Sequence, residues 1–483
     1  MSSFSDGSRA PGDRSPETIR AFSPSTTPSA SEAVTTRTPW STRVLPGSLS
    51  DEWELIARVG GPPVSQHPRR RIPRWSDVEP FLRRPPRPGA RPDAVDRRLA
   101  RCITISDLAK RAKRRVPGPV WDYVHTGAEE EVTLRRNREA FERVEFSPRA
   151  FEQVGEPDLR TTILGKPATS PLFMAPTGYS RLSHHTGELA VAAAAAAAGV
   201  PYTLSTYATT SIADVAKVGG RNWFQFYVMR DRAVSREHAE EGRRQGFEAA
   251  VLTIDTALTG LKASDLRNGF SVPPRLTART LAGFARRPVW VANTLTTDPL
   301  RFATFPAGSE YGVWGASNHL REPHLRPADV AWLKDLWGGP VVVKGVLSVA
   351  DAIAAVDAGA DAIQLSNHGG RQLDRSPVPL ELLPRVVDAV GDRAEVYLDS
   401  GVRSGADVVA ALGFGARAVG IGRAYLYGLM VGGRRGVDRC LDILTSDMKR
   451  TMALLGTADV GAIGAEHVGF VPRGSYAQVP PLR

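Results

Sequence analysis

Cysteine is almost missing from this chain, which has only Cys102 and Cys440 among its 483 residues. Two thiols are too few for a disulfide framework or for a metal site built from cysteines, so we predict no metal centre. The same scarcity fits the reducing cytoplasm, and it favours two inert thiols over a redox pair.

Long apolar runs are missing as well. We find no stretch of about twenty apolar residues that could span a bilayer, and the N-terminus lacks the apolar segment of a secretory signal. Residues 189–200 are apolar and mostly alanine, but this run is too short to cross and predicts a helix packed closely on a sheet. We therefore expect a cytoplasmic protein whose membrane association, if any, is peripheral, at the inner face of the cell membrane.

Acidic residues are fewer than basic ones, which gives a net charge of +11 and an isoelectric point of about 9.9. Such a balance can favour anionic substrates or acidic membranes; no nucleic-acid-binding motif accompanies it, so no nucleic-acid partner is predicted. Arginines and prolines gather within residues 69–87, and residues 1–50 are rich in Ser, Thr and Pro. We predict a low-complexity, disordered extension over residues 1–100 and a folded domain over residues 101–483. The basic arm is interpreted as a solvated linker, with weak contact to anionic lipid as the alternative.

The folded part alternates short apolar runs with alanine-rich helical stretches. Eight runs are predicted strands, namely residues 172–175, 202–204, 223–227, 249–254, 341–343, 362–365, 396–398 and 418–421. This alternation predicts an α/β fold, and eight units favour a closed (β/α)8 barrel over an open sheet, whose strands are usually fewer. Residues 258–327 are too long for a simple connection, so we expect an excursion over the barrel mouth that acts as a lid, partner surface or lipid contact.

The stretch Leu-Ser-Asn-His-Gly-Gly-Arg-Gln-Leu-Asp at residues 365–374 follows the sixth predicted strand. Its two glycines make a helix unlikely, so His368 and Arg371 should project from a tight loop. A histidine can take a proton near neutral pH and an arginine can orient a carboxylate, which together suit proton abstraction from a carboxylate-bearing substrate. The open alternative is a turn in which His368 bonds a backbone carbonyl and Arg371 pairs with Asp374.

Polar residues follow nearly every predicted strand, where a barrel of this kind carries its reactive groups. Each of these residues alone could instead cap a helix or bond backbone amides, and their joint placement favours function. The strand-end residues are Ser205, Gln225, Tyr227, Thr253, Asp255, Lys344, His368, Arg371, Asp399, Gly422 and Arg423.

From about Thr104 to Val468 the sequence resembles the FMN-dependent 2-hydroxy acid dehydrogenase and oxidase family. The segment of residues 366–374 is highly specific to that family. Residues 399–401 and 422–429 look most like the bacterial respiratory L-lactate dehydrogenases. Further matching motifs are Asn-Arg-Glu-Ala-Phe at 137–141, Met-Ala-Pro-Thr at 174–177, Val-Lys-Gly at 343–345 and Ile-Gly-Arg-Ala at 421–424.

The resemblance implies roles for individual residues. His368 would take a proton from the hydroxy acid, Asp255 would orient and stabilise its imidazolium, and Tyr227 would bond the reacting hydroxyl. Tyr123, Arg371 and Lys262 would bind the substrate carboxylate. The residues expected to hold FMN are Ala175, Thr177, Ser205, Gln225, Thr253, Lys344, Asp399, Gly401, Arg403, Gly422 and Arg423, the last five at its phosphate.

Two positions depart from the family pattern. Lys262 stands where the family has a second arginine, which keeps the charge and loses the bidentate fork. Tyr207 stands where short-chain oxidases often have tryptophan. The resemblance therefore implies FMN-dependent oxidation of an L-2-hydroxy acid, most plausibly L-lactate to pyruvate, with a quinone or another respiratory carrier as electron acceptor and a homotetramer as the assembly. The alternatives are an oxygen-dependent oxidase, a flavin-barrel isomerase and a non-catalytic flavin-binding protein.

Overall fold

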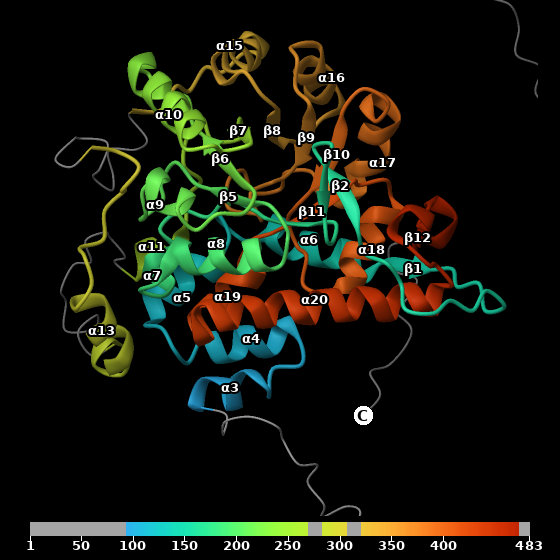
Figure 1. The fold of residues 1–483 in the computed structure, drawn as a ribbon, viewed down its shortest axis with the longest axis horizontal. Helices are drawn as coiled ribbons and strands as arrows, with labels where there is room; N and C mark the ends of the chain where they lie inside the picture. The colour runs from blue at the N-terminus through green and yellow to red at the C-terminus, as the bar shows by residue number, and fades with distance from the viewer. Residues whose placement is uncertain (1–92, 269–282, 307–319, 473–483) are drawn as a thin grey trace, which may run out of the picture. The chain divides into compact units, whose positions relative to one another are not determined.

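The computed structural model describes residues 93–268, 283–306 and 320–472, and within them eight parallel strands close into a barrel (Figure 1). The strands are β4 Leu172–Met174, β5 Tyr202–Leu204, β6 Asn222–Phe226, β7 Ala249–Thr253, β8 Val341–Val346, β9 Ala362–Leu365, β10 Glu395–Leu398 and β11 Ala418–Ile421. The predicted (β/α)8 barrel is confirmed, with a strand at each predicted run. The largest difference is β8, which continues past its predicted end at residue 343 to Val346 through an irregular register.

Aromatic side chains plug the barrel at the N-terminal ends of its strands. The rings of Phe173, Trp223 and Tyr397 pack with centroid distances between 5.5 and 6.2 Å. A hairpin of β2 (Thr161–Ile163) and β3 (Lys166–Ala168) adds its buried residues to the same cluster. Since this end is filled, any cavity along the barrel axis lies at the carboxyl ends of the strands.

Helices alternate with the strands around the barrel (Figure 1). The alanine-rich run of residues 189–200 forms most of α8, as predicted, and alanine lets this helix approach β4 and β5 closely. The helices between and after the strands are α8 Gly187–Ala197, α9 Ile212–Ala216, α10 Arg232–Arg244, α15 Pro327–Trp337, α16 Val349–Asp357, α17 Pro379–Val390, α18 Gly405–Gly413 and α19 Arg423–Gly432.

Further helices flank the barrel: α3 Ala94–Leu99, α4 Ile105–Ala112, α5 Gly118–His125, α6 Val132–Glu142 and α20 Arg434–Leu455. Helices α19 and α20 meet at glycines, since a Cβ on Gly436 would lie 1.9 Å from the carbonyl oxygen of Gly428. Helix α3 contacts both, and Arg98 donates to the carbonyl of Val431 at 2.9 Å. This helix lies before the boundary predicted at residue 100, and the rest of the predicted extension, residues 1–92, lies outside the described residues.

The predicted excursion joins β7 to α15. Its described parts include α11 (Ala263–Arg267) and α13 (Pro288–Leu295), while residues 269–282 and 307–319 are not described. The Trp290 indole donates to the carbonyl of Leu182 at 3.0 Å, and Phe302 is buried. The excursion is therefore packed against the barrel and adds to the wall of its mouth.

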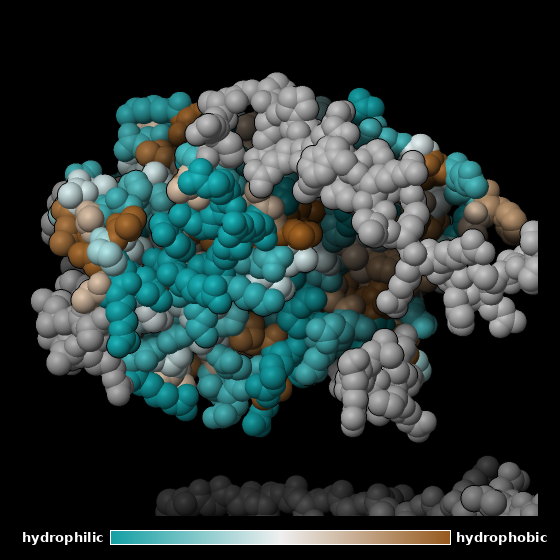
Figure 2. Space-filling view, turned by 90° about the horizontal axis from the view of Figure 1, so that it is seen from below, coloured by the Kyte–Doolittle hydropathy of each residue, from teal (hydrophilic) through white to brown (hydrophobic). Residues whose placement is uncertain are grey.

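The surface shows little continuous apolar area on the face seen from below Figure 1, where hydrophilic residues cover most of the described part (Figure 2). Within the described ranges, no helix combines the length and apolar composition needed to cross a membrane. Cys102 and Cys440 are free and buried, and burial raises the pKa of both thiols. Both therefore stay protonated near neutral pH.

Candidate active site

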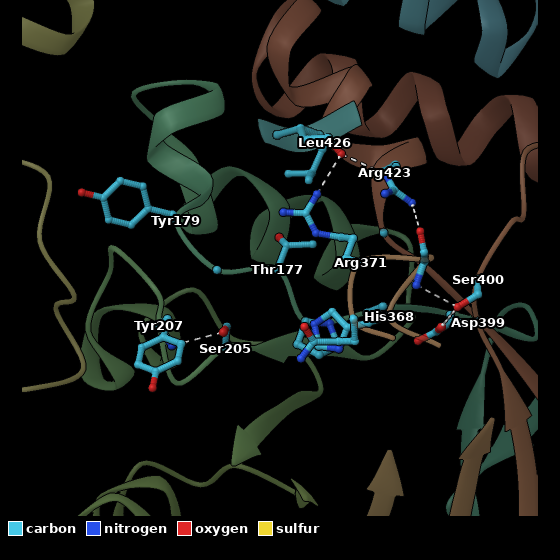
Figure 3. Close-up of a pocket in the computed structure, with 18 of the residues that line it drawn as sticks. Thr177, Tyr179, Ser205, Tyr207, His368, Arg371, Asp399, Ser400, Arg423 and Leu426 are labelled. Carbon is cyan, nitrogen blue, oxygen red and sulfur yellow. Dashed lines mark hydrogen bonds between the residues drawn. The ribbon is translucent and has the colours of Figure 1, made fainter. Parts of the chain in front are cut away.

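A cavity of about 310 Å³ lies at the carboxyl ends of the barrel strands. In Figure 3, Thr177, Arg371 and His368 lie around its middle, with Ser205 on one side and Asp399 on the other. The predicted site residues that line it are Tyr123, Ala175, Thr177, Ser205, Tyr227, Lys262, Lys344, His368, Arg371, Asp399, Gly401, Arg403, Gly422 and Arg423.

The imidazole of His368 pairs with the carboxylate of Asp255, which stands behind the cavity wall. His368 Nδ1 lies 3.2 Å from both Asp255 carboxylate oxygens. Burial lowers the pKa of His368, the charge of Lys344 acts in the same direction, and Asp255 opposes them. Burial favours a higher pKa for Asp255, but His368 and Lys344 outweigh it and lower that pKa. Near pH 7 the pair therefore consists of a charged Asp255 carboxylate and a neutral His368 imidazole. Nε2 of that imidazole can accept a proton.

The backbone around His368 is held in a conformation that few non-glycine residues adopt. Its φ is 58°, in the left-handed region, which persists where surrounding contacts enforce it. Ser400 Oγ, on the loop after β10, accepts hydrogen bonds from the amides of Asn367 at 3.3 Å and Gly369 at 3.0 Å. Asn367 and Asn137 of α6 exchange amide hydrogen bonds of 2.7 and 2.8 Å. Contacts to two other segments therefore fix the residues on both sides of the imidazole.

The alternative interpretation of this loop does not describe its contacts. Asp374 accepts hydrogen bonds from the amides of Val132 at 3.2 Å and Thr133 at 2.7 Å, at the start of α6. It therefore satisfies helix N–H groups, where the alternative expected a pair with Arg371. His368 likewise pairs with a carboxylate where the alternative expected a carbonyl.

Two cationic side chains converge on the ring of Tyr123, which α5 carries. The guanidinium carbon of Arg371 lies 5.2 Å from the ring centroid, and Lys262 Nζ lies 4.7 Å from it. Arg371 Nη1 also donates to the backbone carbonyl of Tyr123 at 2.7 Å. Burial raises the pKa of Tyr123 to about 12, so its hydroxyl stays protonated. This corner of the cavity offers two cations and a hydroxyl to an anion.

Burial changes the ionisation of Lys262. It lowers the lysine pKa to about 7, and the charge of Arg371 acts in the same direction. Asp265, whose Oδ2 lies 4.0 Å from Lys262 Nζ, opposes this shift. An arginine at this position would stay charged at any physiological pH, so Lys262 makes the charge of this corner sensitive to pH near neutrality.

Lys344 adds a third cationic side chain to the cavity wall, and this one is buried. Only 3% of the residue is exposed, and its Nζ donates to Ser366 Oγ at 3.0 Å and lies 3.8 Å from Asp399 Oδ2. Asp399 also accepts hydrogen bonds from Gln364 at 2.6 Å and from Ser400 at 2.7 Å. Because both charges are paired and hydrogen-bonded, the cation is kept in a fixed position where no water need solvate it.

Three of the predicted cofactor residues form a hydrogen-bonded chain across β5, β6 and β7. Ser205 Oγ donates to Gln225 Oε1 at 3.2 Å, and Gln225 Nε2 donates to Thr253 Oγ1 at 3.1 Å. Ser205 lines the cavity, whereas Gln225 and Thr253 are buried behind it. On the loop after the neighbouring strand β4, Thr177 Oγ1 lies 2.6 Å from the hydroxyl of Tyr425, a contact residue that the sequence did not indicate.

The loops after β10 and β11 form the end of the cavity predicted for a phosphate. A Cβ added to Gly422 would meet no atom within 4 Å, so this glycine leaves open space at the start of α19. Arg403 also lines this end. The side chain of Arg423 braces the loops, because its three guanidinium nitrogens donate to the carbonyls of Val124, Thr126 and Gly369. Phosphate contacts here would therefore come from backbone amides and Arg403 in this conformation.

These features fit FMN. A flat ring needs an apolar and hydroxyl-lined slot with a cation at its polar edge, which Ala175, Ser205 and Lys344 supply. The phosphate needs an open helix N-terminus with basic residues nearby, which the Gly422 end supplies.

Sequence reasoning placed the excursion over the barrel mouth but did not identify which of its residues line the cavity. Phe302 and Arg321 both line the cavity, and Tyr207 packs its ring 4.8 Å from that of Phe302. Irregular Pro-, Trp- and Arg-rich sequence has no period from which an inward direction could be predicted. The only available signal was that a connection of this length needs a structural reason.

Known proteins are similar to this chain in sequence and in fold. A family model described as FMN-dependent dehydrogenase matches residues 112–469. A Mycobacterium tuberculosis protein provisionally named L-lactate dehydrogenase is 45% identical over 404 residues, which cover 83% of this chain and 96% of that protein. An L-lactate oxidase of Nostoc sp. is 39% identical over 363 residues, or 74% of this chain and 95% of the oxidase. The solved structure of the monotopic membrane protein (S)-mandelate dehydrogenase matches with a TM-score of 0.74 and 34% identity, covering 77% of this chain and all of that one.

Proposed function

Since the chain belongs to the family of FMN-dependent 2-hydroxy acid dehydrogenases and oxidases, we propose that it oxidises L-lactate to pyruvate in this cavity. The observation that carries the proposal is the His368–Asp255 pair beside the two cations over Tyr123. That arrangement supplies a proton acceptor and a carboxylate clamp within one cavity. The relatives named for L-lactate support the choice of acid.

The residues divide the work between holding the acid and moving its proton. Arg371, Lys262 and Tyr123 hold the carboxylate, and Tyr227 bonds the hydroxyl. His368 accepts the hydroxyl proton at Nε2, and the negative charge of Asp255 stabilises the imidazolium that results. Bound FMN would supply the acceptor for the α-hydrogen, which leaves the carbon together with the two electrons of its C–H bond.

Another set of residues would hold FMN. Ala175, Thr177 and Ser205, which line the cavity, would bond the edge of its ring, and the hydrogen-bonded chain of Gln225 and Thr253 would position Ser205 from behind the wall. Lys344 would provide the fixed positive charge that favours negative charge on the ring. The loops with Asp399, Gly401, Arg403, Gly422 and Arg423 would surround its phosphate.

Lys262 gives the proposal a pH signature. As pH rises through about 7, the free enzyme loses the Lys262 charge, so kcat/KM for L-lactate should fall by roughly tenfold through KM. At lower pH, protonation of His368 should also lower kcat/KM, and this fall is the acid limb of the profile. Lys262→Arg keeps its charge, and we expect the alkaline fall to disappear while the acid limb stays. The measurement is kcat/KM from about pH 5 to about pH 9.

A matched control for that profile is Lys334→Arg, a lysine on α15 that pairs with Asp361 outside the cavity. This control should keep the alkaline fall. The same fall in Lys262→Arg would show that another group titrates, and the assignment of Lys262 to the carboxylate would then be wrong.

The electron acceptor is proposed to be a quinone or another respiratory carrier, with the enzyme peripheral at the inner face of the membrane. Exposed leucines beside the cavity mouth support a contact with lipid or an apolar carrier. Leu258 is 74% exposed, Leu261 56% and Leu373 69%, and their neighbours Thr259, Lys262 and Gln372 line the cavity. Oxygen is the second candidate, because several relatives, the Nostoc protein among them, are named oxidases.

Steady-state turnover tests the reaction and its acceptor together. Purified FMN-loaded protein should form one pyruvate per soluble quinone analogue reduced, and faster than it forms peroxide in air. Faster peroxide formation would favour the oxidase, and no pyruvate with either acceptor would reject the proposed reaction. The homotetramer stays a prediction, which light scattering of the same sample measures.

A further inference from the structure

Arg321 is a buried cation of the cavity that the roles above leave unused. The residue is 4% exposed and lines the cavity. Its guanidinium carbon lies 5.2 Å from the centroid of the Tyr227 ring, and its Nη2 donates to Thr259 Oγ1 at 3.0 Å. A guanidinium placed in a cavity wall in this way is held by an aromatic face and a hydroxyl while it presents positive charge to the site.

The backbone fixes Arg321 in this place. It forms an antiparallel bridge with Met229, just after β6. On either side, the amide of Arg230 donates to the carbonyl of Leu320 at 2.9 Å, and the amide of Glu322 donates to the carbonyl of Val228 at 2.9 Å. The end of the excursion is therefore paired with the segment that carries Tyr227, and the arginine belongs to a built wall.

Arg321 occupies a different position from the carboxylate clamp. Arg371 and Lys262 lie over the ring of Tyr123, whereas Arg321 lies over the ring of Tyr227. The side-chain pocket beyond Tyr227 is otherwise aromatic, since the ring of Tyr207 lies 5.1 Å from that of Tyr227 and 4.8 Å from that of Phe302. If the carboxylate and hydroxyl of the acid lie on Tyr123 and Tyr227, Arg321 faces the substrate side chain.

The other cations of the described cavity wall already have proposed roles. FMN phosphate and one substrate carboxylate would meet the cations at the Gly422 end and over Tyr123, and Arg321 is separate from both. Among the described residues that line the cavity, the cations are Lys262, Arg321, Lys344, Arg371, Arg403 and Arg423, and the carboxylate is Asp399.

We propose that Arg321 selects 2-hydroxy acids whose side chain ends in a second carboxylate. This inference rests on the proposed function, because it needs the first carboxylate to lie on Arg371. A carboxylate can accept two parallel hydrogen bonds from a guanidinium, whereas the methyl group of lactate offers no acceptor. L-Lactate would then be a substrate that leaves this contact unmade, and a dicarboxylic acid would use it.

The test compares two acids of equal chain length, L-2-hydroxyglutarate and L-2-hydroxypentanoate, on the FMN-loaded enzyme. Wild-type protein should favour the dicarboxylic acid in kcat/KM by roughly tenfold to a hundredfold, the effect of a charge-assisted hydrogen bond. Arg321→Met should remove or reverse that preference. The control Arg232→Met removes an arginine that lies 4.8 Å over Trp332 outside the cavity, and it should keep the preference.

Binding of the corresponding 2-oxo acids gives a second readout that needs no turnover. Changes in flavin absorbance should show 2-oxoglutarate binding more tightly than 2-oxopentanoate in wild type, and this difference should vanish in Arg321→Met. An equal loss for both acids would place Arg321 on the shared carboxylate and overturn the proposal, as would an unchanged ratio. If Arg321→Met does not fold, Arg321→Lys should lower the ratio, and an unchanged ratio there overturns the proposal equally.

Failure of the proposed function looks different. If no 2-hydroxy acid reduces the flavin, the reaction is wrong, while the 2-oxo acid binding ratio still tests Arg321. If L-lactate is oxidised and wild type shows no preference for the dicarboxylic acid, the reaction stands and the role of Arg321 falls.

Discussion

His368→Gln is expected to give a protein that binds FMN normally and whose flavin L-lactate no longer reduces at a useful rate. Glutamine can occupy the space of the imidazole but cannot accept a proton, so reduction should slow by roughly a thousandfold or more. The expectation follows from the geometry, since His368 Nδ1 is committed to Asp255 and Nε2 is left as the proton acceptor. The measurement is the anaerobic rate of flavin reduction after mixing with L-lactate.

A buried histidine outside the cavity provides the control for that variant. His238 bonds the carbonyl of Thr304 at 3.1 Å and does not line the cavity. His238→Gln should keep rapid reduction if the protein folds. FMN content equal to wild type must accompany the slow reduction in His368→Gln. An unchanged reduction rate in His368→Gln would remove this residue as the base.

Asp255→Asn is expected to have the second largest effect, slowing reduction by roughly a hundredfold while FMN stays bound. The carboxylate stabilises the imidazolium that forms during the reaction, and a neutral amide cannot. The pH profile should change too. Because Asp255 raises the pKa of His368, its loss should lower that pKa further, so the acid limb of kcat/KM should move to lower pH.

Asp374→Asn separates this effect from simple loss of structure. Asp374 bonds the first amides of α6 and does not line the cavity, so its variant should lower stability without moving the acid limb. If Asp255→Asn leaves the acid limb in place, His368 is not the group that titrates there. If it leaves the rate unchanged, the carboxylate does not assist the base.

The strands could be predicted from the sequence because each is buried and short, and helices separate them. Strands β5, β9 and β11 have the predicted bounds. Strand β8 was predicted too short because Lys344 and Gly345 interrupt its apolar run, and only the neighbouring strands show that pairing continues past them. A polar residue such as Lys344 can therefore belong to the active site and still lie inside a strand, so it need not mark the end of that strand.

Part of the site could be predicted once the strands had been predicted. A barrel brings all carboxyl strand ends together, so His368, Lys344 and Asp399 meet in one cavity as expected. The direction of a strand-end side chain depends on its neighbours, and Gln225 and Thr253 turned out to lie behind the wall.

Contacts between distant segments could not be predicted. Asp374 binds the start of α6, which lies more than two hundred residues earlier in the chain. Two guanidinium nitrogens of Arg423 donate to carbonyls at the end of α5, although its position after the last strand had predicted that it binds the phosphate. The position of Arg321 depends on a backbone bridge to Met229, which no local sequence pattern predicts.

Anaerobic mixing of the FMN-loaded wild-type protein with L-lactate, and separately with D-lactate, tests the central claim most directly. The carboxylate clamp and the Tyr227–His368 side fix the carboxylate and the hydroxyl of the acid, and bound FMN would accept the α-hydrogen from one side only, so only one enantiomer can react. The account predicts that L-lactate bleaches the flavin and yields one pyruvate per flavin, while D-lactate leaves it oxidised. A flavin that stays oxidised with L-lactate, or bleaches equally with both enantiomers, would contradict it.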